Sequence, residues 1–230
     1  MLGRYINKFG LWWFVTDIYW NRFIPDQVGK KLRSRRKDEN VELPDKFILL
    51  PLQVQDDTQI LMHSRFSGME EVIEETVQAA KSLNYQLVIK EHPQDLGRVN
   101  YEEIKKKYPE VVWVRWIPIP ELIKKADVVV TVNSSVGIEA LLEKKPVVVL
   151  GDAFYNKPGV VWSARKGEMA NQISSALNTK LNHQLIDGFI AYLNDYFISG
   201  TWTQFSDQTL TEIVHRVVED RYAGKIYILE

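Results

Sequence analysis

The segment Asn133-Ser134-Ser135-Val136-Gly137 has the clearest chemical potential in this 230-residue sequence. It places two hydroxyls and several free backbone N–H groups at the start of an expected helix, where they could bind a phosphate. Gly137 favours this interpretation because a missing side chain lets a ligand approach the backbone closely. Glu139 could bind a ribose hydroxyl pair or merely complement the helix dipole. Ser and Asn also favour helix starts for structural reasons alone, so a simple N-cap stays open.

A histidine and two adjacent carboxylates are the candidates for proton transfer. His92 precedes Pro93 at the end of an apolar run, so its ring would be held in place and could donate to a phosphate or a leaving group. A purely structural histidine is the alternative. Asp56 and Asp57 could supply a base or a metal ligand, although adjacent acids in a loop are often only solvated. One Asp pair and one His are weak support for a metal site.

Five short segments rich in β-branched residues must position these side chains. They alternate with amphipathic stretches, which predicts βαβ units, and their nearly unbroken hydrophobicity predicts a parallel sheet with helices on both faces. The fold class is therefore α/β, a Rossmann-like doubly wound sheet. Such sheets bind ligands outside the carboxyl ends of their strands, where the candidate residues lie. The expected strands are 47–53, 85–91, 111–116, 127–132 and 146–151.

Helix signals fill the gaps between these strands. Ser67 and Glu70 predict a capping box that opens a helix from about 68 to 82, and Asn84 ends it. A short helix is expected after Pro118 and another after Ser135, which stops before Lys144. The remaining expected helices are 100–107, 167–178, 183–198 and 207–221.

Composition excludes several classes of protein. Lys and Arg total 29 against 30 for Asp and Glu, a net charge of −1, so there is no global attraction to nucleic acid and any anion site must be local. The absence of cysteine excludes disulfides, thiolate nucleophiles and Cys-ligated metals. No Gly-x-Gly-x-x-Gly, Walker or Gly-x-Ser-x-Gly motif occurs, which argues against a dinucleotide oxidoreductase, a P-loop NTPase and a hydrolase triad.

An aromatic, apolar stretch at 9–24 precedes a basic linker at 30–37. The stretch is shorter than the roughly 20 residues that span a bilayer, and no signal-peptide cleavage site follows it. Two interpretations stay open: a helix packed on the body of the protein, or docking on a membrane surface or a partner, since aromatic and basic residues suit an anionic interface.

Three stretches together resemble the capsule polysaccharide biosynthesis family, which includes β-Kdo glycosyltransferases of the KpsS and KpsC type. They are residues 50–60 (LPLQVQDDTQI), 87–93 (LVIKEHP) and 126–155 (ADVVVTVNSSVGIEALLEKKPVVVLGDAFY). As a set in this order, these motifs are quite specific. The resemblance covers about residues 47–160. It implies the C-terminal, nucleotide-sugar-binding domain of a GT-B glycosyltransferase, with flanking N- and C-terminal helices.

The resemblance also implies how a donor would be bound. His92 and Pro93 match a His-Pro motif that contacts CMP, and Ser134 and Ser135 match a Ser-Ser/Thr motif that holds the CMP phosphate. Asn133 and Gly137 frame that motif, and Pro118-Ile119-Pro120-Glu121 lies where the base is flanked in such folds.

A Gln-x-x-x-Asp pattern, matched by Gln53 and Asp57, is implied to lie near the sugar and the acceptor. Asp57 is then the general base for an inverting transfer from CMP-Kdo, with Asp56 as the nearest substitute. CMP leaves with its negative charge stabilised by helix N–H groups, hydroxyls and His92, so the resemblance implies neither a metal nor a cofactor.

Only about 45 residues precede the first expected strand, too few for the N-terminal acceptor domain of a complete GT-B enzyme. The expected division is a helix and linker at 1–45, a nucleotide-sugar-binding domain at 46–180 and a helical extension at 181–230. Expected partners are the CMP-sugar, a lipid or saccharide acceptor, and a partner domain or capsule assembly complex; nucleic acid is not expected. The expected location is cytoplasmic, and a position peripheral to the inner membrane stays open.

Three alternatives stay open beside a Kdo transferase. The chain could be a non-catalytic nucleotide-binding or scaffold protein in capsular polysaccharide export. It could be an inactive half of a split or truncated transferase. It could also be another nucleotide-sugar enzyme of related fold, such as an epimerase or a UDP-sugar transferase, although the His-Pro and Ser-Ser pair favours CMP over UDP.

Overall fold

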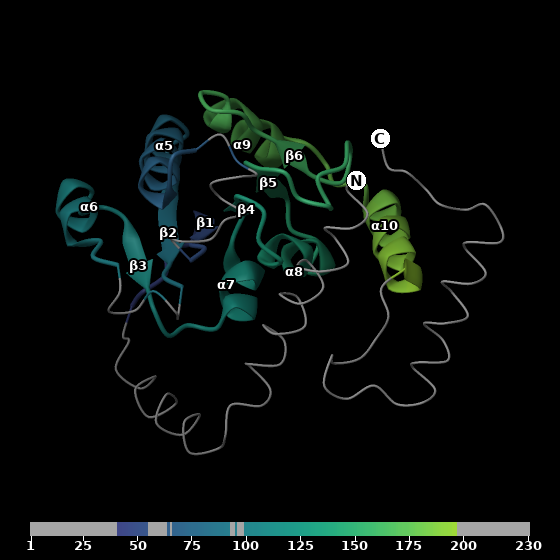
Figure 1. The fold of residues 1–230 in the computed structure, drawn as a ribbon, viewed down its shortest axis with the longest axis horizontal. Helices are drawn as coiled ribbons and strands as arrows, with labels where there is room; N and C mark the ends of the chain where they lie inside the picture. Colours follow the sequence, from purple (N-terminus) through teal and green to yellow (C-terminus); the bar gives the residue numbers. More distant parts are fainter. Residues whose placement is uncertain (1–40, 55–63, 65, 93–94, 96–98, 197–230) are drawn as a thin grey trace, which may run out of the picture. The chain divides into compact units, whose positions relative to one another are not determined.

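The computed structural model describes residues 41–54, 64, 66–92, 95 and 99–196 (Figure 1). The helices expected at 9–24 and 207–221 lie outside these residues. The described residues up to Ile190 form one compact unit. Its strands are β1 (Phe47–Pro51), β2 (Gln86–Lys90), β3 (Val112–Val114), β4 (Val128–Thr131), β5 (Val147–Val149) and β6 (Trp162–Ser163). The helices are α5 (Met69–Ser82), α6 (Glu102–Lys107), α7 (Ile119–Lys125), α8 (Val136–Leu142), α9 (Met169–Asn178) and α10 (His183–Tyr196).

All six strands form one parallel sheet in the order β3-β2-β1-β4-β5-β6. The chain winds outward from β1 to β3, returns to place β4 beside β1, and then winds outward on the other side. Leu49 of β1 therefore pairs with Val88 of β2 and with Val129 of β4. The predicted doubly wound α/β fold and all five predicted strands are confirmed, and the switch point lies between β1 and β4.

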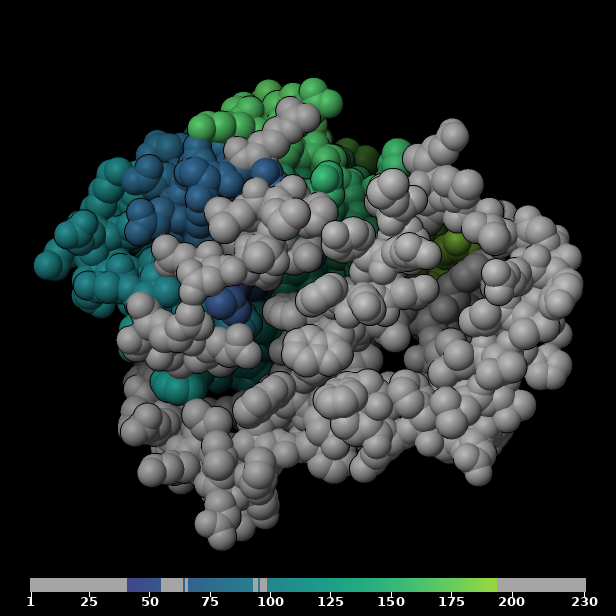
Figure 2. Space-filling model, viewed as in Figure 1, coloured from purple at the N-terminus to yellow at the C-terminus, as the bar shows by residue number. Residues whose placement is uncertain are grey.

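Helices cover both faces of the sheet. α5 packs beside α9 on one face and α7 packs beside α8 on the other (Figure 1). Figure 2 shows the surfaces of α5 and α9 side by side from the same viewpoint. Because both faces are covered, the side chains of β1, β4 and β5 are buried along the whole length of each strand. Among the described residues, no helix is long and apolar enough to cross a membrane.

The start of α5 differs from the predicted capping box. The helix begins at Met69, with Gly68 as N-cap, so Glu71 rather than Glu70 occupies the third helical position. The backbone N–H and the hydroxyl of Ser67 both donate to Glu71 Oε2, at 2.8 and 2.9 Å. The prediction chose the wrong carboxylate because it placed the N-cap at Ser67 instead of Gly68.

The predicted end of α5 at Asn84 is confirmed. Asn84 has a φ of 55°, its N–H donates to the Lys81 carbonyl at 3.1 Å, and the N–H of Tyr85 donates to the Ala80 carbonyl at 2.9 Å. This is the Schellman arrangement, and asparagine tolerates its left-handed backbone better than most residues.

The Glu71 carboxylate also accepts a hydrogen bond from Lys166 Nζ, in the turn that precedes α9. The hydrogen bonds from Lys166 and then from Ser67 lower the pKa of Glu71 to about 2. The carboxylate therefore stabilises the fold above its unfolded pKa, near 4.5, and this stabilisation is lost as the pH falls toward 2.

We predict that Glu71→Gln lowers the free energy of unfolding at pH 7, and that the difference from wild type shrinks as the pH is lowered from 5 toward 3. Urea denaturation across this pH range measures the difference. Glu103→Gln is the matched control, since Glu103 is an exposed carboxylate on α6 without an ion pair among the described residues. A Glu71→Gln deficit that is independent of pH would contradict the assigned role of the charge.

Candidate functional site

Two hydrogen bonds join the loops that follow β1 and β4. Gln53 Nε2 donates to Asn133 Oδ1 at 2.8 Å, and the Asn133 backbone N–H donates to Gln53 Oε1 at 3.1 Å. Gln53 is only 3% exposed. Both polar atoms of its side chain are thus directed to Asn133, and the pair spans the switch point of the sheet.

The loop from Thr131 to Gly137 is closed by its own polar groups. The Ser134 N–H donates to Thr131 Oγ1 at 3.2 Å, the Val136 N–H donates to Ser134 Oγ at 3.3 Å, and the Gly137 N–H donates to the Ser134 carbonyl at 3.0 Å. Ser134 is 5% exposed, whereas Ser135 is half-buried and its hydroxyl has no hydrogen-bond partner among the described residues. Ser135 is therefore the hydroxyl of this pair that the structure presents at the surface.

This geometry corrects the expectation of several free backbone N–H groups before α8. The N–H groups of Asn133, Ser134, Val136 and Gly137 all donate within the turn or to Gln53, and Val136 and Gly137 are the first two residues of α8.

Gly137 has a packing role that was not predicted from the sequence. A Cβ at this position would lie 2.6 Å from Cε2 and from Cζ of Tyr155. The ring of Tyr155, from the loop after β5, is fully buried, and its hydroxyl donates to the Ser134 carbonyl oxygen. Burial raises the pKa of Tyr155, which keeps the hydroxyl protonated as a donor. The space that a Cβ would need at Gly137 is occupied by this ring, so packing of Tyr155 requires a glycine here, and approach of a ligand to this backbone stays a prediction.

His92 follows a residue that is fixed by two cations. Glu91, 5% exposed, accepts from Lys105 Nζ through Oε1 and from Arg115 Nε through Oε2, each at 2.7 Å. His92 itself is half-buried, and its carbonyl accepts the Asp95 N–H at 3.0 Å. Sequence reasoning missed Glu91, although an acidic residue directly after a buried strand was a usable signal.

The carboxyl ends of β1 and β2 are also joined. The Leu52 N–H, next to Gln53, donates at 2.9 Å to the carbonyl of Lys90, two residues before His92. Ser64 forms a backbone bridge with Gly151 after β5. Both described residues that flank 55–63, Val54 and Ser64, therefore lie at this edge of the sheet.

The structure thus links Gln53 directly to Asn133, and Ser134, Ser135 and Gly137 follow in the same turn. His92 lies one strand away from Gln53, and Glu139 lies half-buried in the first turn of α8. Asp56, Asp57 and Pro93 lie outside the described residues. Within the described part of the chain, no group of three potential metal-ligating residues occurs.

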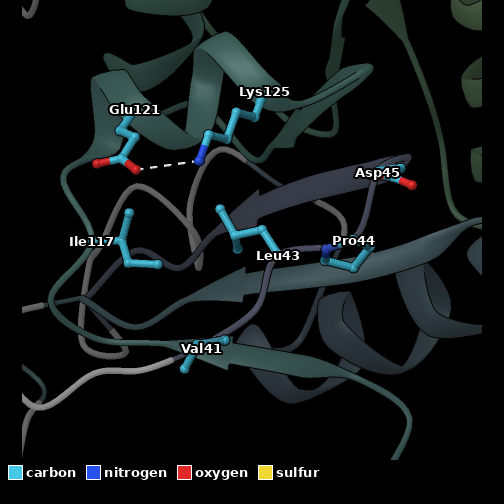
Figure 3. Close-up of a pocket in the computed structure, with 7 residues that line it drawn as sticks. All are labelled: Val41, Leu43, Pro44, Asp45, Ile117, Glu121 and Lys125. Carbon is cyan, nitrogen blue, oxygen red and sulfur yellow. Dashed lines mark hydrogen bonds and ion pairs between the residues drawn. The ribbon is translucent and has the colours of Figure 1, made fainter.

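A cavity of about 470 Å³ lies away from these residues, between α7 and the segment that leads into β1 (Figure 3). Apolar and charged side chains both line it, and the one ion pair drawn there joins Lys125 Nζ to Glu121 Oε1 at 3.4 Å. The cavity shares only Glu121 with the residues that the sequence singled out, as part of the stretch expected to flank the base. Its lining residues are Val41, Leu43, Pro44, Asp45, Ile117, Glu121 and Lys125.

A sequence model of the family described as "Capsule polysaccharide biosynthesis protein" matches residues 17–196. The capsule polysaccharide export protein KpsS of Escherichia coli is 33% identical over 173 residues, which cover 69% of this chain and 43% of KpsS. Protein FixF of Sinorhizobium fredii is 34% identical, covering 74% of this chain and 43% of FixF. The matched region therefore spans less than half the length of these relatives.

Solved structures with a similar fold are more distant in sequence. The β-Kdo 2,4 transferase of Thermosulfurimonas dismutans KpsC is 20% identical, with a TM-score of 0.46, over 60% of this chain and 48% of that one. The UDP-GlcNAc 2-epimerase of Methanocaldococcus jannaschii is 16% identical, with a TM-score of 0.48, over 72% and 50%.

We predict that Gly137→Ala destabilises the protein by about 1–3 kcal/mol, because the added methyl overlaps a buried ring that cannot move away. Chemical denaturation measures the change. Gly188→Ala in α10 is the matched control: nothing lies within 4 Å of a Cβ there, so the helix gains up to about 1 kcal/mol. Replacing Tyr155 with Leu should reduce the Gly137→Ala penalty, and equal penalties in both backgrounds would contradict the overlap.

The Gln53–Asn133 pair gives a second prediction. Gln53→Glu and Asn133→Asp should each be tolerated, since one amide remains that can donate to the new carboxylate. The double variant places two carboxylates together, so its loss of stability should exceed the sum of the single losses by about 1–3 kcal/mol at pH 7. Denaturation of all four proteins measures this coupling, and additive losses would show that the two side chains do not pair in solution.

Proposed function

The chain belongs to the capsule polysaccharide biosynthesis family, and we propose that the carboxyl edge of its sheet binds the nucleotide of a CMP-sugar donor used to build capsule polysaccharide. The observation that carries the proposal is the Gln53–Asn133 pair. It fixes the Ser134-Ser135 turn at the switch point between β1 and β4, where open α/β sheets bind their ligands.

The proposed donor is CMP-Kdo, which follows from the His-Pro and Ser-Ser motifs. The half-buried hydroxyl of Ser135 would donate to the CMP phosphate, and His92 would donate from the neighbouring strand. Buried Ser134 would shape the turn instead. Near-zero net charge is compatible with an anionic donor, because these contacts are local.

The proposed reaction is an inverting transfer. Asp57 would take the proton from an acceptor hydroxyl as its oxygen attacks the anomeric carbon of Kdo, and the bond from that carbon to the CMP phosphate oxygen would break. CMP would leave as a phosphate monoester that already carries negative charge. Hydroxyl and imidazole donors can stabilise this leaving group, so the proposed step uses no metal or cofactor.

The acceptor, a lipid or saccharide, would be held by a partner domain or a capsule assembly complex, since the matched region spans less than half of the relatives' length. The proposed location is the cytoplasmic side, peripheral to the inner membrane.

A second candidate function is nucleotide-dependent assembly in capsule export without catalysis. The relative KpsS carries the name of an export protein. In addition, the side chain of Gln53, one of the implied site residues, is hydrogen-bonded to Asn133. Binding of CMP without transfer would favour this candidate over the transferase.

Calorimetric titration of the full chain tests the shared premise. We predict that CMP binds and that UDP binds at least tenfold more weakly. Ser135→Ala should weaken CMP binding about tenfold, the loss of one charge-assisted hydrogen bond. Asp57→Ala should leave CMP binding nearly intact but abolish transfer from CMP-Kdo to a supplied acceptor.

Two control variants accompany this experiment. Ser174→Ala, on α9, should leave CMP binding unchanged. Ser134→Ala should lower stability through the turn more than Ser135→Ala does. Absence of CMP binding by the wild-type chain would refute the proposed function, and lost CMP binding in Asp57→Ala would remove the role of Asp57 as base.

A further inference from the structure

A buried ion cluster lies directly before His92, at the carboxyl ends of β2 and β3. Glu91 connects three elements: its own strand end, Lys105 on α6, and Arg115 after β3. The side chain of Glu91 is 6% exposed, against 22% for Lys105 and 48% for Arg115. The anion is thus the buried centre of the cluster, and the cations close it from outside.

The cluster is held in one geometry by further contacts. Lys105 Nζ lies 4.9 Å from the ring centroid of Trp113, a cation–π distance, and Trp113 packs on Tyr101 with ring centroids 5.4 Å apart. On the other side, Lys90 Nζ donates to the Arg115 carbonyl oxygen. The Lys105 ammonium therefore has a second contact besides the carboxylate, and the backbone of Arg115 is held separately by Lys90.

Backbone hydrogen bonds on either side of Glu91 and His92 also fix the backbone of His92. The Glu91 N–H donates to the Val114 carbonyl at 3.0 Å, which extends the β2–β3 ladder one residue beyond β2. The carbonyl of His92 then accepts the Asp95 N–H. His92 is thus the first residue beyond the ladder, and its backbone is fixed on both sides.

Stability alone is a poor explanation for this arrangement. Burying a carboxylate with its cations recovers little net free energy, whereas removing one partner is costly. Apolar side chains already cover the sheet here, as Val88, Ile89 and Val114 are fully buried.

We infer that Glu91 is a positioning residue for His92, with Lys105 and Arg115 as the cations that hold it. The inference rests on the proposed function, because it concerns how His92 is presented to the nucleotide. Glu91 touches no ligand in this scheme. It sets the direction in which the strand ends, and so the position of the imidazole.

The test compares CMP binding in a double-mutant cycle on the full chain. Glu91→Gln should weaken CMP binding about fivefold to tenfold in the wild-type background. In the His92→Ala background it should have no further effect, because Glu91 acts through His92. Glu74→Gln is the matched control, since it breaks an exposed pair with Lys107 and should leave CMP affinity unchanged. Equal weakening by Glu91→Gln in both backgrounds would overturn the inference.

A second readout needs no nucleotide. The imidazole ring signals of His92, identified by their loss in His92→Ala, should broaden or double in Glu91→Gln and stay unchanged in Glu74→Gln. Unchanged His92 signals in Glu91→Gln would overturn the positioning role. This arm decides the inference even if the wild-type chain binds no CMP, a result that would refute only the proposed function. If Glu91→Gln fails to fold, Arg115→Gln removes the more exposed cation and should alter the His92 signals in the same way.

Discussion

The reciprocal amide pair of Gln53 and Asn133 is the interaction on which the candidate site depends. Burial of apolar side chains fixes the strands, but it does not fix the loops that leave their carboxyl ends. At the switch point the chain turns away in opposite directions after β1 and β4, so these two loops need a direct connection. A buried amide that loses its partner costs about 1–3 kcal/mol, which makes the paired geometry strongly preferred. The turn that carries Ser135 inherits its position from this pair.

Polar connections between neighbouring strand ends occur at every step along the sheet from β3 to β5. Glu91 joins the ends of β2 and β3 through Arg115, and the Leu52 N–H joins the ends of β1 and β2. Tyr155 joins the loop after β5 to the turn after β4. Each connection uses a buried or backbone polar group, and each lies at or just beyond the carboxyl ends of the strands. The carboxyl edge is therefore a continuous hydrogen-bonded row rather than a set of independent loops.

These connections show which features of the fold and of the candidate site could be predicted from the sequence. The five main strands and the end of α5 at Asn84 follow from local apolar runs and backbone preferences, so they were predictable. β6 has only two residues, and it exists because β5 offers it an edge to pair with. Gln53 and Gly137 were recognised as special, but their partners are 80 and 18 residues away in the chain. A residue that contacts a ligand and a residue that contacts a distant side chain look alike in the sequence, and only the fold distinguishes them.

Most polar groups at this edge are directed inward, which bears on the two candidate functions. Gln53, Ser134 and Glu91 hold the loops, while Ser135 and His92, the side chains proposed to contact the nucleotide, are half-buried. This contact set, taken from the described residues, suits recognition of one phosphate by a nearly neutral chain. It does not by itself supply an acceptor site. A transferase and an export scaffold would therefore share this edge and differ in what faces it. A measurement of CMP binding therefore tests the carboxyl edge of the sheet, whereas a measurement of sugar transfer tests the part of the assembly that faces this edge.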